Sequence, residues 1–286
     1  MTTRLPLRHV DGLPALQRTL IMGVVNVTPD SFSDGGRYAD TEAAVRHGYD
    51  LRAQGADVLD IGGESTRPGA TRPLVAEELD RVVPVIRALA GEGIPVSVDT
   101  MRSEVAAASI AAGAVLVNDV SGGLADHDIL RVVADGGAAY VVMHWRAHAD
   151  QMRQHASYDD VVTDVVAELG ARIDAALAAG IAPEHLVLDP GLGFAKTAEH
   201  NWELLRHLAE LDRLGLPILV GSSRKSFLGS LLADSSGRPR HVLDREDANV
   251  ALTTIAAMQG VWGVRVHDVR ASADAIAVVT RWRGLP

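Results

Sequence analysis

The chain has 286 residues, a formal net charge of −10 and no cysteine. Its length suits one α/β barrel of about 250 residues. Its composition, 47% hydrophobic and 22% charged, is that of a folded enzyme. The missing cysteines exclude disulfides and thiolate chemistry. Because an acidic surface repels phosphate backbones, we expect no nucleic-acid partner.

Neither a secretory signal nor a membrane span is expected. Charged residues, among them Arg4, Arg8 and Arg18, interrupt the first nineteen residues. No later segment holds about 18 uncharged apolar residues in a row, the length that a spanning helix needs. We therefore expect a cytoplasmic protein with no membrane association.

Short β-branched runs alternate with longer Ala- and Leu-rich stretches, a pattern typical of repeated strand–helix units. Strands are predicted at Leu20–Asn26, Asp57–Ile61, Pro95–Val98, Val115–Asn118, Ala139–Met143, Leu186–Leu188, Ile218–Val220 and Gly263–Val266. Helical patterns include Glu42–Ala53, Ala76–Ala90, Ser103–Ala112, Tyr158–Ala179 and Asp247–Gln259. Most strands are continuous apolar runs, as expected for a parallel sheet that helices cover.

This organisation predicts an α/β fold, a (β/α)8 TIM barrel that forms a single domain over residues 1–286, with residues 1–19 as an N-terminal extension. An open, doubly wound sheet is the alternative, but no G-x-G-x-x-G follows the first strand. The polar segment Ala233–His241 is predicted to be a surface excursion in the seventh strand–helix unit. The stretches Val27–Asp40 and Gly62–Ala76, rich in Gly, Ser, Thr and Pro, are expected to be long loops that serve as active-site lids.

Polar residues stand at the carboxyl end of every predicted strand, where a barrel of this kind carries its chemistry. They are Asn26, Asp60, Asp99, Asn118, His144, Asp189, Arg224 with Lys225, and Arg265 with His267. Each alone could be structural; Asp99, for example, could cap the helix that follows it. Together they predict a polar ligand in the barrel mouth, because unpartnered polar groups there cost free energy.

The types of these residues indicate two kinds of ligand group. The carboxylate and amide groups of Asp99, Asn118 and Asp189 can pair with a flat heterocycle that carries amino and ring N–H donors. The basic residues at the same rim are Arg67, Arg224, Lys225, Arg265 and His267. They predict a local anion site, which a helix start near Ser222 and Ser223 would strengthen.

Other kinds of catalytic site are weakly supported. Ser65 or Ser223 could act as a nucleophile only beside a base, and the spacing of the sequence supplies none. His144, His148 and His155 fit no standard metal-ligand spacing, which favours solvated histidines.

Several segments, taken in order, resemble dihydropteroate synthases. Two are long, Met22–Gly36 and Leu59–Gly69, and therefore specific. The shorter ones are Val98–Thr100, Asn118–Asp119, Leu188–Phe194, Gly221–Ser226 and Arg265–Val269. The match spans residues 20 to 270, and Met143–Trp145 and His200–Trp202 suggest the actinobacterial type. The resemblance implies that p-aminobenzoate is joined to 6-hydroxymethyl-7,8-dihydropterin diphosphate, which yields 7,8-dihydropteroate and diphosphate in folate biosynthesis.

The resemblance also implies roles for individual residues. The pterin would be held by Asp99, Asn118, Met143, Asp189 and Lys225. The p-aminobenzoate would be framed by Thr66, Arg67, Pro68, Phe194 and Ser226. Asn26 would ligate the cofactor Mg2+, and Asn26, Arg265 and His267 would bind the diphosphate. Catalytic roles would fall to Asp30, Arg67, Asp99 and Lys225, and the protein would be a homodimer.

Two other functions remain open on the sequence alone. One is a methyltetrahydrofolate-dependent methyltransferase, a barrel that shares the floor residues. It would need neither the Ser65–Pro68 loop nor the Arg265-x-His267 pair. The other is a carrier that binds pterin diphosphate but releases no diphosphate when p-aminobenzoate is added.

Overall fold

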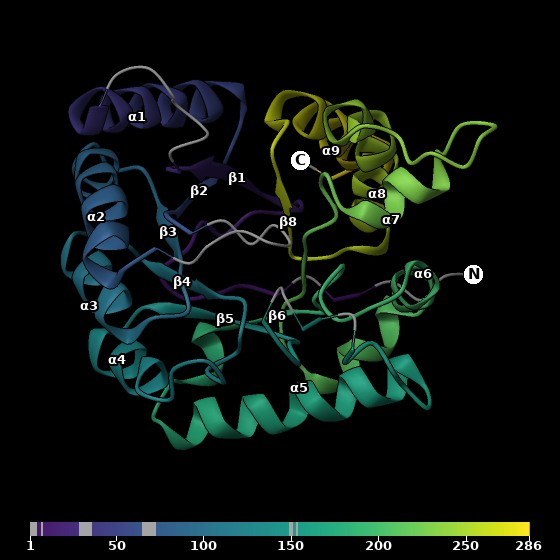
Figure 1. The fold of residues 1–286 in the computed structure, drawn as a ribbon, viewed down its shortest axis with the longest axis horizontal. Helices are drawn as coiled ribbons and strands as arrows, with labels where there is room; N and C mark the ends of the chain where they lie inside the picture. The colour runs from purple at the N-terminus through teal and green to yellow at the C-terminus, as the bar shows by residue number, and fades with distance from the viewer. Residues whose placement is uncertain are drawn as a thin grey trace.

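The computed structural model describes residues 5–6, 8–28, 36–64, 73–148, 151–152 and 154–285, without the side chains of residues 36–40. In these ranges eight parallel strands form a ring, and helices surround it on the outside (Figure 1). Among the described helices, none has both the length and the apolar composition that crossing a membrane requires.

The strands are β1 Leu20–Asn26, β2 Val58–Gly62, β3 Val96–Asp99, β4 Leu116–Asp119, β5 Ala139–Met143, β6 Leu186–Asp189, β7 Leu219–Val220 and β8 Gly263–Val266. The α-helices are α1 Gly36–Gln54, α2 Val75–Gly91, α3 Ser103–Ala111, α4 Ile129–Gly136, α5 Val161–Ala178, α6 Ala198–Arg206, α7 Ser226–Leu231, α8 Glu246–Gln259 and α9 Val269–Trp282. Short 3-10 helices are η2 Pro183–His185, η3 Leu208–Leu214 and η4 Val242–Arg245.

The ring of strands closes on itself. Its order is β6-β5-β4-β3-β2-β1-β8-β7, and an isolated bridge between Leu188 and Ile218 connects β6 with β7. The backbone N–H of Leu188 also donates to the carbonyl of Pro217 at 2.8 Å. The predicted (β/α)8 barrel is therefore confirmed, and the open doubly wound sheet is wrong.

The predicted strand boundaries agree with the structure to within one residue, whereas the first helix differs more. Helix α1 begins at Gly36 and not at Glu42, so residues 36–40 are helical although a loop was expected there. The rest of that loop, residues 29–35, and residues 65–72 of the second loop lie outside the described residues. The excursion 233–241 lies between α7 and η4 and is largely exposed, as predicted.

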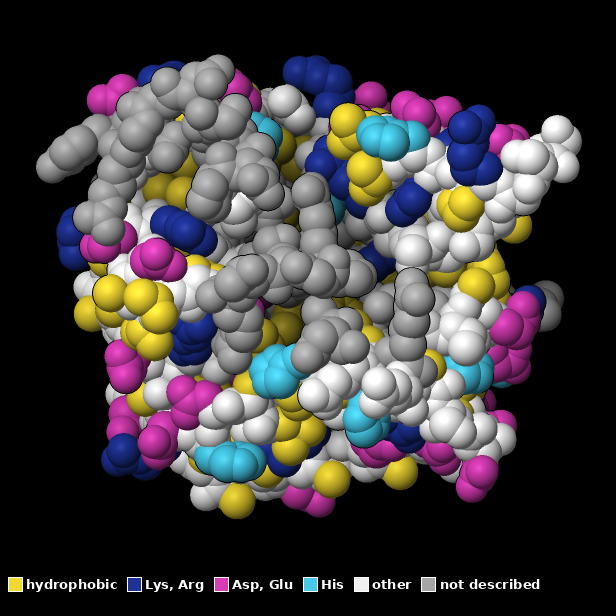
Figure 2. All heavy atoms as spheres, in the orientation of Figure 1, with side chains coloured by type: hydrophobic (Ala, Val, Ile, Leu, Met, Phe, Trp, Pro, Cys, Tyr) yellow, Lys and Arg dark blue, Asp and Glu magenta, His cyan; other side chains and the backbone are white. Residues whose placement is uncertain are grey.

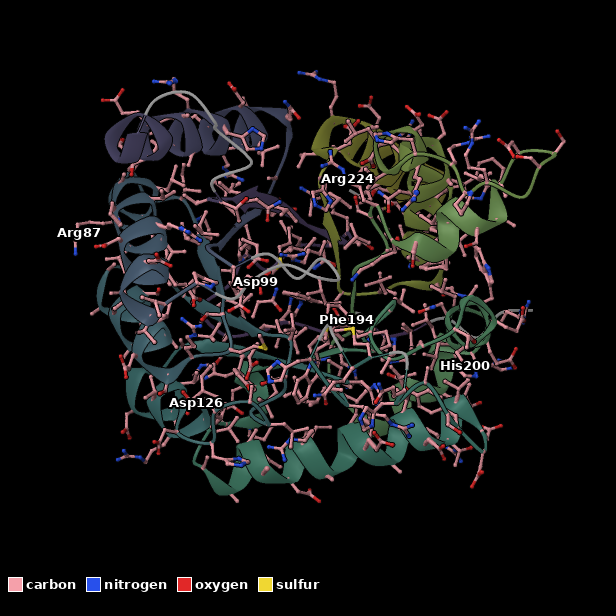
Figure 3. All side chains as sticks on the ribbon, viewed as in Figure 1. Arg87, Asp99, Asp126, Phe194, His200 and Arg224 are labelled. Atoms are coloured by element: carbon pink, nitrogen blue, oxygen red, sulfur yellow. The ribbon has the colours of Figure 1, made fainter. Side chains whose placement is uncertain are left out.

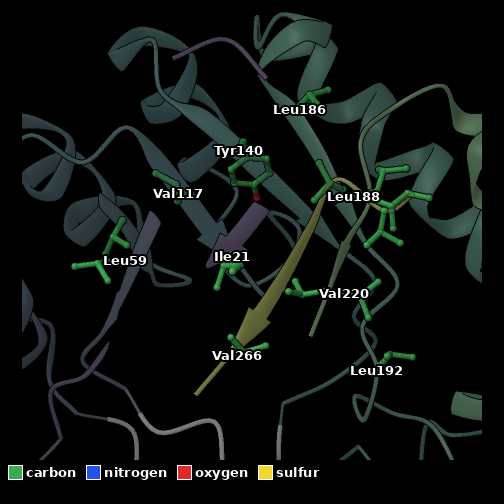
Figure 4. Close-up of a cluster of buried hydrophobic side chains, with 14 of the residues drawn as sticks. Ile21, Leu59, Val117, Tyr140, Leu186, Leu188, Leu192, Val220 and Val266 are labelled. Carbon is green, nitrogen blue, oxygen red and sulfur yellow. The ribbon is translucent and has the colours of Figure 1, made fainter. Parts of the chain in front are cut away.

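Side chains alternate between the inside and the outside of the barrel, as the two-residue period of a strand requires. On the outside, Ile21, Leu59 and Tyr140 are buried between strands and helices (Figure 4). Inside, an apolar layer is built from Leu20, Met22, Val58, Leu116, Val141, Val187 and Leu219. On several strands a polar residue stands two positions after the apolar one and therefore also faces the inside of the barrel. The inner face thus changes from apolar to polar toward the carboxyl ends, in agreement with the polar residues predicted at the strand ends.

The N-terminal segment covers the opposite end of the barrel. Val10 and Leu13 are buried in the inner apolar cluster, which also includes Trp262. Arg18 donates two hydrogen bonds to the carboxylate of Asp57, at 2.7 and 2.8 Å. That carboxylate also accepts from the backbone N–H of Ile21 at 2.8 Å. Asp57, expected as the first residue of the second strand, therefore stands just before β2 and links the starts of β1 and β2.

A buried polar group stabilises the turn after β4. Asp119 accepts hydrogen bonds from the backbone of Ser121 and Gly123, from the hydroxyl of Ser121 and from the hydroxyl of Tyr140 at 2.7 Å. Burial raises the pKa of Asp119, and these four hydrogen bonds oppose the rise. The carboxylate therefore depends on its donors.

Replacement of Tyr140 by Phe removes one of these donors and should lower the free energy of unfolding by about 1–3 kcal/mol. Urea denaturation followed by circular dichroism measures it. Tyr49 is 41% exposed, and its replacement by Phe is the matched control, with an expected change within about 0.5 kcal/mol. Equal stability of the two variants would show that the Tyr140 hydroxyl contributes nothing to the fold.

Candidate active site

One pocket opens at the carboxyl ends of the strands and contains most of the predicted residues. Its lining consists of Asp99, Asn118, Val120, Met143, Asp189, Leu192, Phe194, Gly221, Ser223, Lys225, Arg265 and His267. In Figure 3, Asp99 and Phe194 lie near the centre of the ring, whereas Arg87 projects outward from α2. Charged side chains of both signs also lie along the margin of this face (Figure 2). The strand-end pattern of the sequence therefore predicted the position of the pocket correctly.

The floor of the pocket is a network of charges around Arg265. Its Nε donates to Asp60 Oδ2 and its Nη2 to Asp99 Oδ2, both at 2.6 Å. Asn118 Nδ2 donates to the same oxygen of Asp60 at 3.0 Å. Burial raises the pKa of Asp99 to about 7, with Arg265 opposing and Asp60 adding to the rise. Arg265, expected on diphosphate, therefore also neutralises the carboxylates of the floor.

Asp189 and Lys225 place opposite charges in the same pocket. Asp189 ends β6, and its Oδ1 accepts from the N–H of Gly191 at 2.7 Å. Lys225 Nζ lies 4.0 Å from the centre of the Phe194 ring, in cation–π contact. Burial lowers the pKa of Lys225 to about 8, and Asp189 opposes that effect. The pair can offer a carboxylate and an ammonium to one polar ligand.

The residues expected at the diphosphate lie toward the rim. His267 Nδ1 is 2.9 Å from the hydroxyl of Ser223, which fixes the ring beside the pocket. Asn26 ends β1 and is paired in register with Gly62, which is paired with Asp99. Asn26 is thus at the same level along the barrel as Asp99, at the carboxyl end of its strand, although it is not among the described residues that line the pocket.

Ser226, expected at p-aminobenzoate, is not among the described residues that line the pocket. Ser226 is the exposed first residue of α7, which begins later than the helix expected near Ser222. The hydroxyl of Ser222 donates to Asn249 Oδ1 at 2.8 Å and so belongs to the fold. The remaining expected residues, Asp30, Ser65, Thr66, Arg67 and Pro68, lie outside the described residues. Asp99 faces the pocket and does not cap α3, whose first N–H binds Asp126.

Beside the pocket lies a polar network that the sequence did not predict. His144, expected to be solvated, is only 1% exposed. Its Nδ1 is 2.8 Å from Lys196 Nζ, and its Nε2 is 3.0 Å from Glu168 Oε2. Burial lowers the pKa of His144 to about 4, which keeps the ring neutral at pH 7. Across the described residues, no three His, Asp or Glu side chains gather as metal ligands, so the histidine cluster is not supported.

Lysine composition was a signal for this network that sequence reasoning had not used. Lysine occurs at only two positions in the whole chain, 196 and 225, and every other cationic side chain among the 27 is arginine. Lys225 lines the pocket, and Lys196 binds the loop that carries Leu192 and Phe194. Because an ammonium is a compact donor and a guanidinium a planar fork, the two side chains are not equivalent at such buried positions.

The geometry defines a class of protein. Buried carboxylates, an amide, an ammonium and a guanidinium converge at the carboxyl end of a (β/α)8 barrel, where enzymes of this fold bind small molecules. The arrangement suits a flat, polar heterocycle with an anionic group attached.

Comparison with known proteins identifies the family. Residues 22–267 match the family described as pterin binding enzyme. A dihydropteroate synthase of Mycobacterium leprae is 54% identical over 263 residues, which cover 92% of this chain and 93% of that protein. The Xanthomonas albilineans dihydropteroate synthase solved with 4-aminobenzoic acid is 45% identical, with a TM-score of 0.87 and 100% of both chains covered. Its structure with 7,8-dihydropteroate is 43% identical, with a TM-score of 0.84 over 98% of this chain and 100% of that one. The chain belongs to the pterin binding enzyme family and, within it, to the dihydropteroate synthases.

The two lysines allow the electrostatics of the pocket to be measured directly. Burial lowers the pKa of Lys196 to about 7 and that of Lys225 to about 8, below the ordinary lysine value of about 10.4. Protein labelled with 13C at lysine Cε should therefore show two signals. One should lose its charge as the pH rises through about 7, and the other through about 8.

Lys196→Arg and Lys225→Arg should each delete one of the signals and so assign them. If both lysines titrated near the ordinary value, the pocket would be as well solvated as the surface and its described charge balance would be wrong.

Proposed function

We propose that the chain condenses 6-hydroxymethyl-7,8-dihydropterin diphosphate with p-aminobenzoate, to give 7,8-dihydropteroate and diphosphate in folate biosynthesis. The observation that carries the proposal is the convergence of Asp99, Asn118, Asp189 and Lys225 in one pocket. The relatives named dihydropteroate synthase support it, since they match nearly the whole chain.

The pterin fits the floor by complementarity of its hydrogen-bonding edge. A carboxylate can bind the guanidine-like edge of a pterin by two parallel hydrogen bonds, and Asp189 is the buried carboxylate placed for that role. Asn118 offers an amide, and Lys225 offers an ammonium to a ring carbonyl or nitrogen. Met143 adds an apolar wall for the flat ring.

The transfer exchanges one bond at the pterin methylene. The bond from this carbon to the diphosphate oxygen breaks, and diphosphate leaves with the electron pair. The amine nitrogen of p-aminobenzoate bonds to the same carbon and gives up one proton. The aromatic amine is already neutral at pH 7, so no strong general base is needed. Asp99 and Asp189 would favour the positive charge that develops on the pterin.

The diphosphate would lie at the rim. His267 and the N–H groups of Arg265 that do not bind Asp60 and Asp99 would face its oxygens. Mg2+ commonly binds phosphate oxygens together with one or two protein oxygens, and the amide of Asn26 at the rim suits that role. When bound, the ion would supply positive charge for the leaving diphosphate.

The remaining assignments rest on the resemblance alone. Phe194 and Ser226 with Thr66, Arg67 and Pro68 would frame p-aminobenzoate, and Asp30 and Arg67 would assist catalysis. Phe194 has structural support, because its ring lines the pocket beside Lys225. A coupled assay for diphosphate release tests the whole proposal. Release that requires both substrates is expected, whereas a carrier or a methyltransferase would release none.

Asp189→Asn should weaken pterin binding about tenfold, because a hydrogen bond to a charged group contributes roughly 1.5–3 kcal/mol. Titration calorimetry with the pterin measures the effect. Asp274→Asn, at an exposed position on α9, is the control and should leave the affinity unchanged. Unchanged affinity in the Asp189 variant would remove this carboxylate from the pterin site.

His267→Ala and Asn26→Ala should weaken binding of the diphosphate ester about tenfold, while the affinity for a pterin without diphosphate stays within about twofold. His127→Ala changes an exposed histidine and serves as the control. Arg265 is less suitable, because its removal would also disturb Asp99. An equal loss for both ligands would place His267 and Asn26 at the pterin ring and not at the diphosphate.

The assembly is proposed to be a homodimer that works in the cytoplasm, with residues 1–286 as one domain. Exposed apolar side chains on α8 and α9, helices that pack together (Figure 1), support a second copy as the partner. They are Ile255, Met258, Val278 and Trp282. Light scattering should give the mass of a dimer, and Ile255→Glu should lower it to that of a monomer. A monomeric parent chain at micromolar concentration would contradict the proposal.

A further inference from the structure

The loop between β6 and α6 has a backbone that needs outside support. Gly191 and Gly193 have φ values of +69° and +78°, and Ala195 has a φ of +45°. An alanine in this left-handed region is strained. A Cβ on Gly191 would lie 2.2 Å from the carbonyl oxygen of His144, so the loop passes very close to the end of β5. Leu192 and Phe194, between these residues, line the pocket.

Lys196 binds this loop at two points. Its Nζ donates to the carbonyl of Gly191 at 3.1 Å and to that of Phe194 at 3.2 Å. A third contact, 2.8 Å to Nδ1 of His144, ties the ammonium to the end of β5. Since Nδ1 accepts from Lys196, the ring proton is on Nε2 and faces Glu168. Arg146 donates a hydrogen bond to Glu168 and so fixes the carboxylate that His144 contacts.

We propose that Lys196 is a positioning residue for the transfer reaction. Its side chain holds the loop after β6 so that Leu192 and Phe194 form one wall of the pocket. The position of Asp189 depends less on Lys196, because Asp189 is held by the sheet. The backbone N–H of His144 donates to the carbonyl of Asp189 at 3.0 Å. Lys196 therefore acts on the p-aminobenzoate side more than on the pterin side. This division rests on the proposed function.

The need for lysine at this position follows from the shape of the group. In its charged form, which predominates below a pH of about 7, Lys196 directs three N–H groups from one atom, one for each of the three acceptors around it. A guanidinium spreads its donors in one plane and needs more room. In the described part of the chain, two residues other than glycine have a left-handed backbone, Ala195 and Arg224. Each of them directly precedes one of the two lysines. Backbone strain is thus located where each lysine is presented.

The test compares Lys196→Met, Lys196→Arg and Lys196→Cys. Because the chain has no other cysteine, alkylation of Lys196→Cys with 2-bromoethylamine restores an amine at this one position, and alkylation with bromoethane gives the matched uncharged side chain. Wild type treated with each reagent is the control. KM and kcat are measured for p-aminobenzoate, the pterin dissociation constant by calorimetry, and loop order by hydrogen exchange of the backbone amides of residues 191–196.

The Met, Arg and ethylated variants should raise the KM for p-aminobenzoate about tenfold, with kcat and the pterin dissociation constant changed less than about threefold. Exchange of the loop amides should accelerate in the same variants. The aminoethylated protein should recover the wild-type values for both. Tyr158→Phe removes the hydrogen bond to the carbonyl of Ala195 and should give a smaller change in the same direction, even if a Lys196 variant folds poorly.

Wild-type kinetics in Lys196→Arg, or an equal loss of pterin and p-aminobenzoate affinity, would overturn the proposal. So would slow loop exchange in the ethylated protein. A wild-type enzyme that released no diphosphate would instead refute the proposed function. Hydrogen exchange and pterin binding would then still decide whether Lys196 holds the loop.

Discussion

The site depends on one guanidinium inside the barrel. Arg265 lies between Asp60 and Asp99, and the side chain of Asp60 is fully buried. Two carboxylates this close inside a protein would not both remain charged without a cation between them. A buried ion pair adds little net stability, because desolvation offsets the attraction. The stability of the barrel comes from the apolar layers below and outside, and the charges at its mouth are kept for the ligand.

A division of roles follows from this arrangement. Asp60 is not among the residues that line the pocket, but it orients both Arg265 and Asn118, which are. The segment before Lys225 is held in a similar way. Arg245 donates to the carbonyl of Arg224 at 2.9 Å, and Glu246 binds the Arg224 side chain at 2.9 Å. Arg245 also binds the carbonyl of Arg240, so the end of the exposed excursion is tied to the pocket.

The sequence predicted the fold and much of the site because both depend on local patterns. Strand runs, their number and the polar residue at each strand end are properties of short segments, and parallel strands bring their carboxyl ends to one rim. The resemblance then supplied the substrate, which no pattern of polar residues could give. Helix α1 was placed too late, because the glycines at its start favour a loop when only neighbours are considered.

Contacts between distant segments were not predictable in this way. His144 directly follows β5, Glu168 lies on α5 and Lys196 on the loop after β6, and only the closed barrel brings them together. Arg265 was expected to bind the diphosphate because its positive charge suggests an anionic ligand. Its contact with Asp60 depends on two strands on either side of β1, which no spacing reveals.

The central claim is that buried carboxylates recognise the amino-bearing edge of a pterin. Calorimetry with 6-hydroxymethylpterin and with the matching pteridine-2,4-dione, which has a carbonyl in place of the amino group, tests it most directly. At position 2 the dione has a carbonyl acceptor in place of the amino donor, so one of the two hydrogen bonds to the carboxylate is lost, while the neighbouring ring N–H still donates. The account predicts that the pterin binds at least about tenfold more tightly. Equal affinity for the two compounds would contradict it.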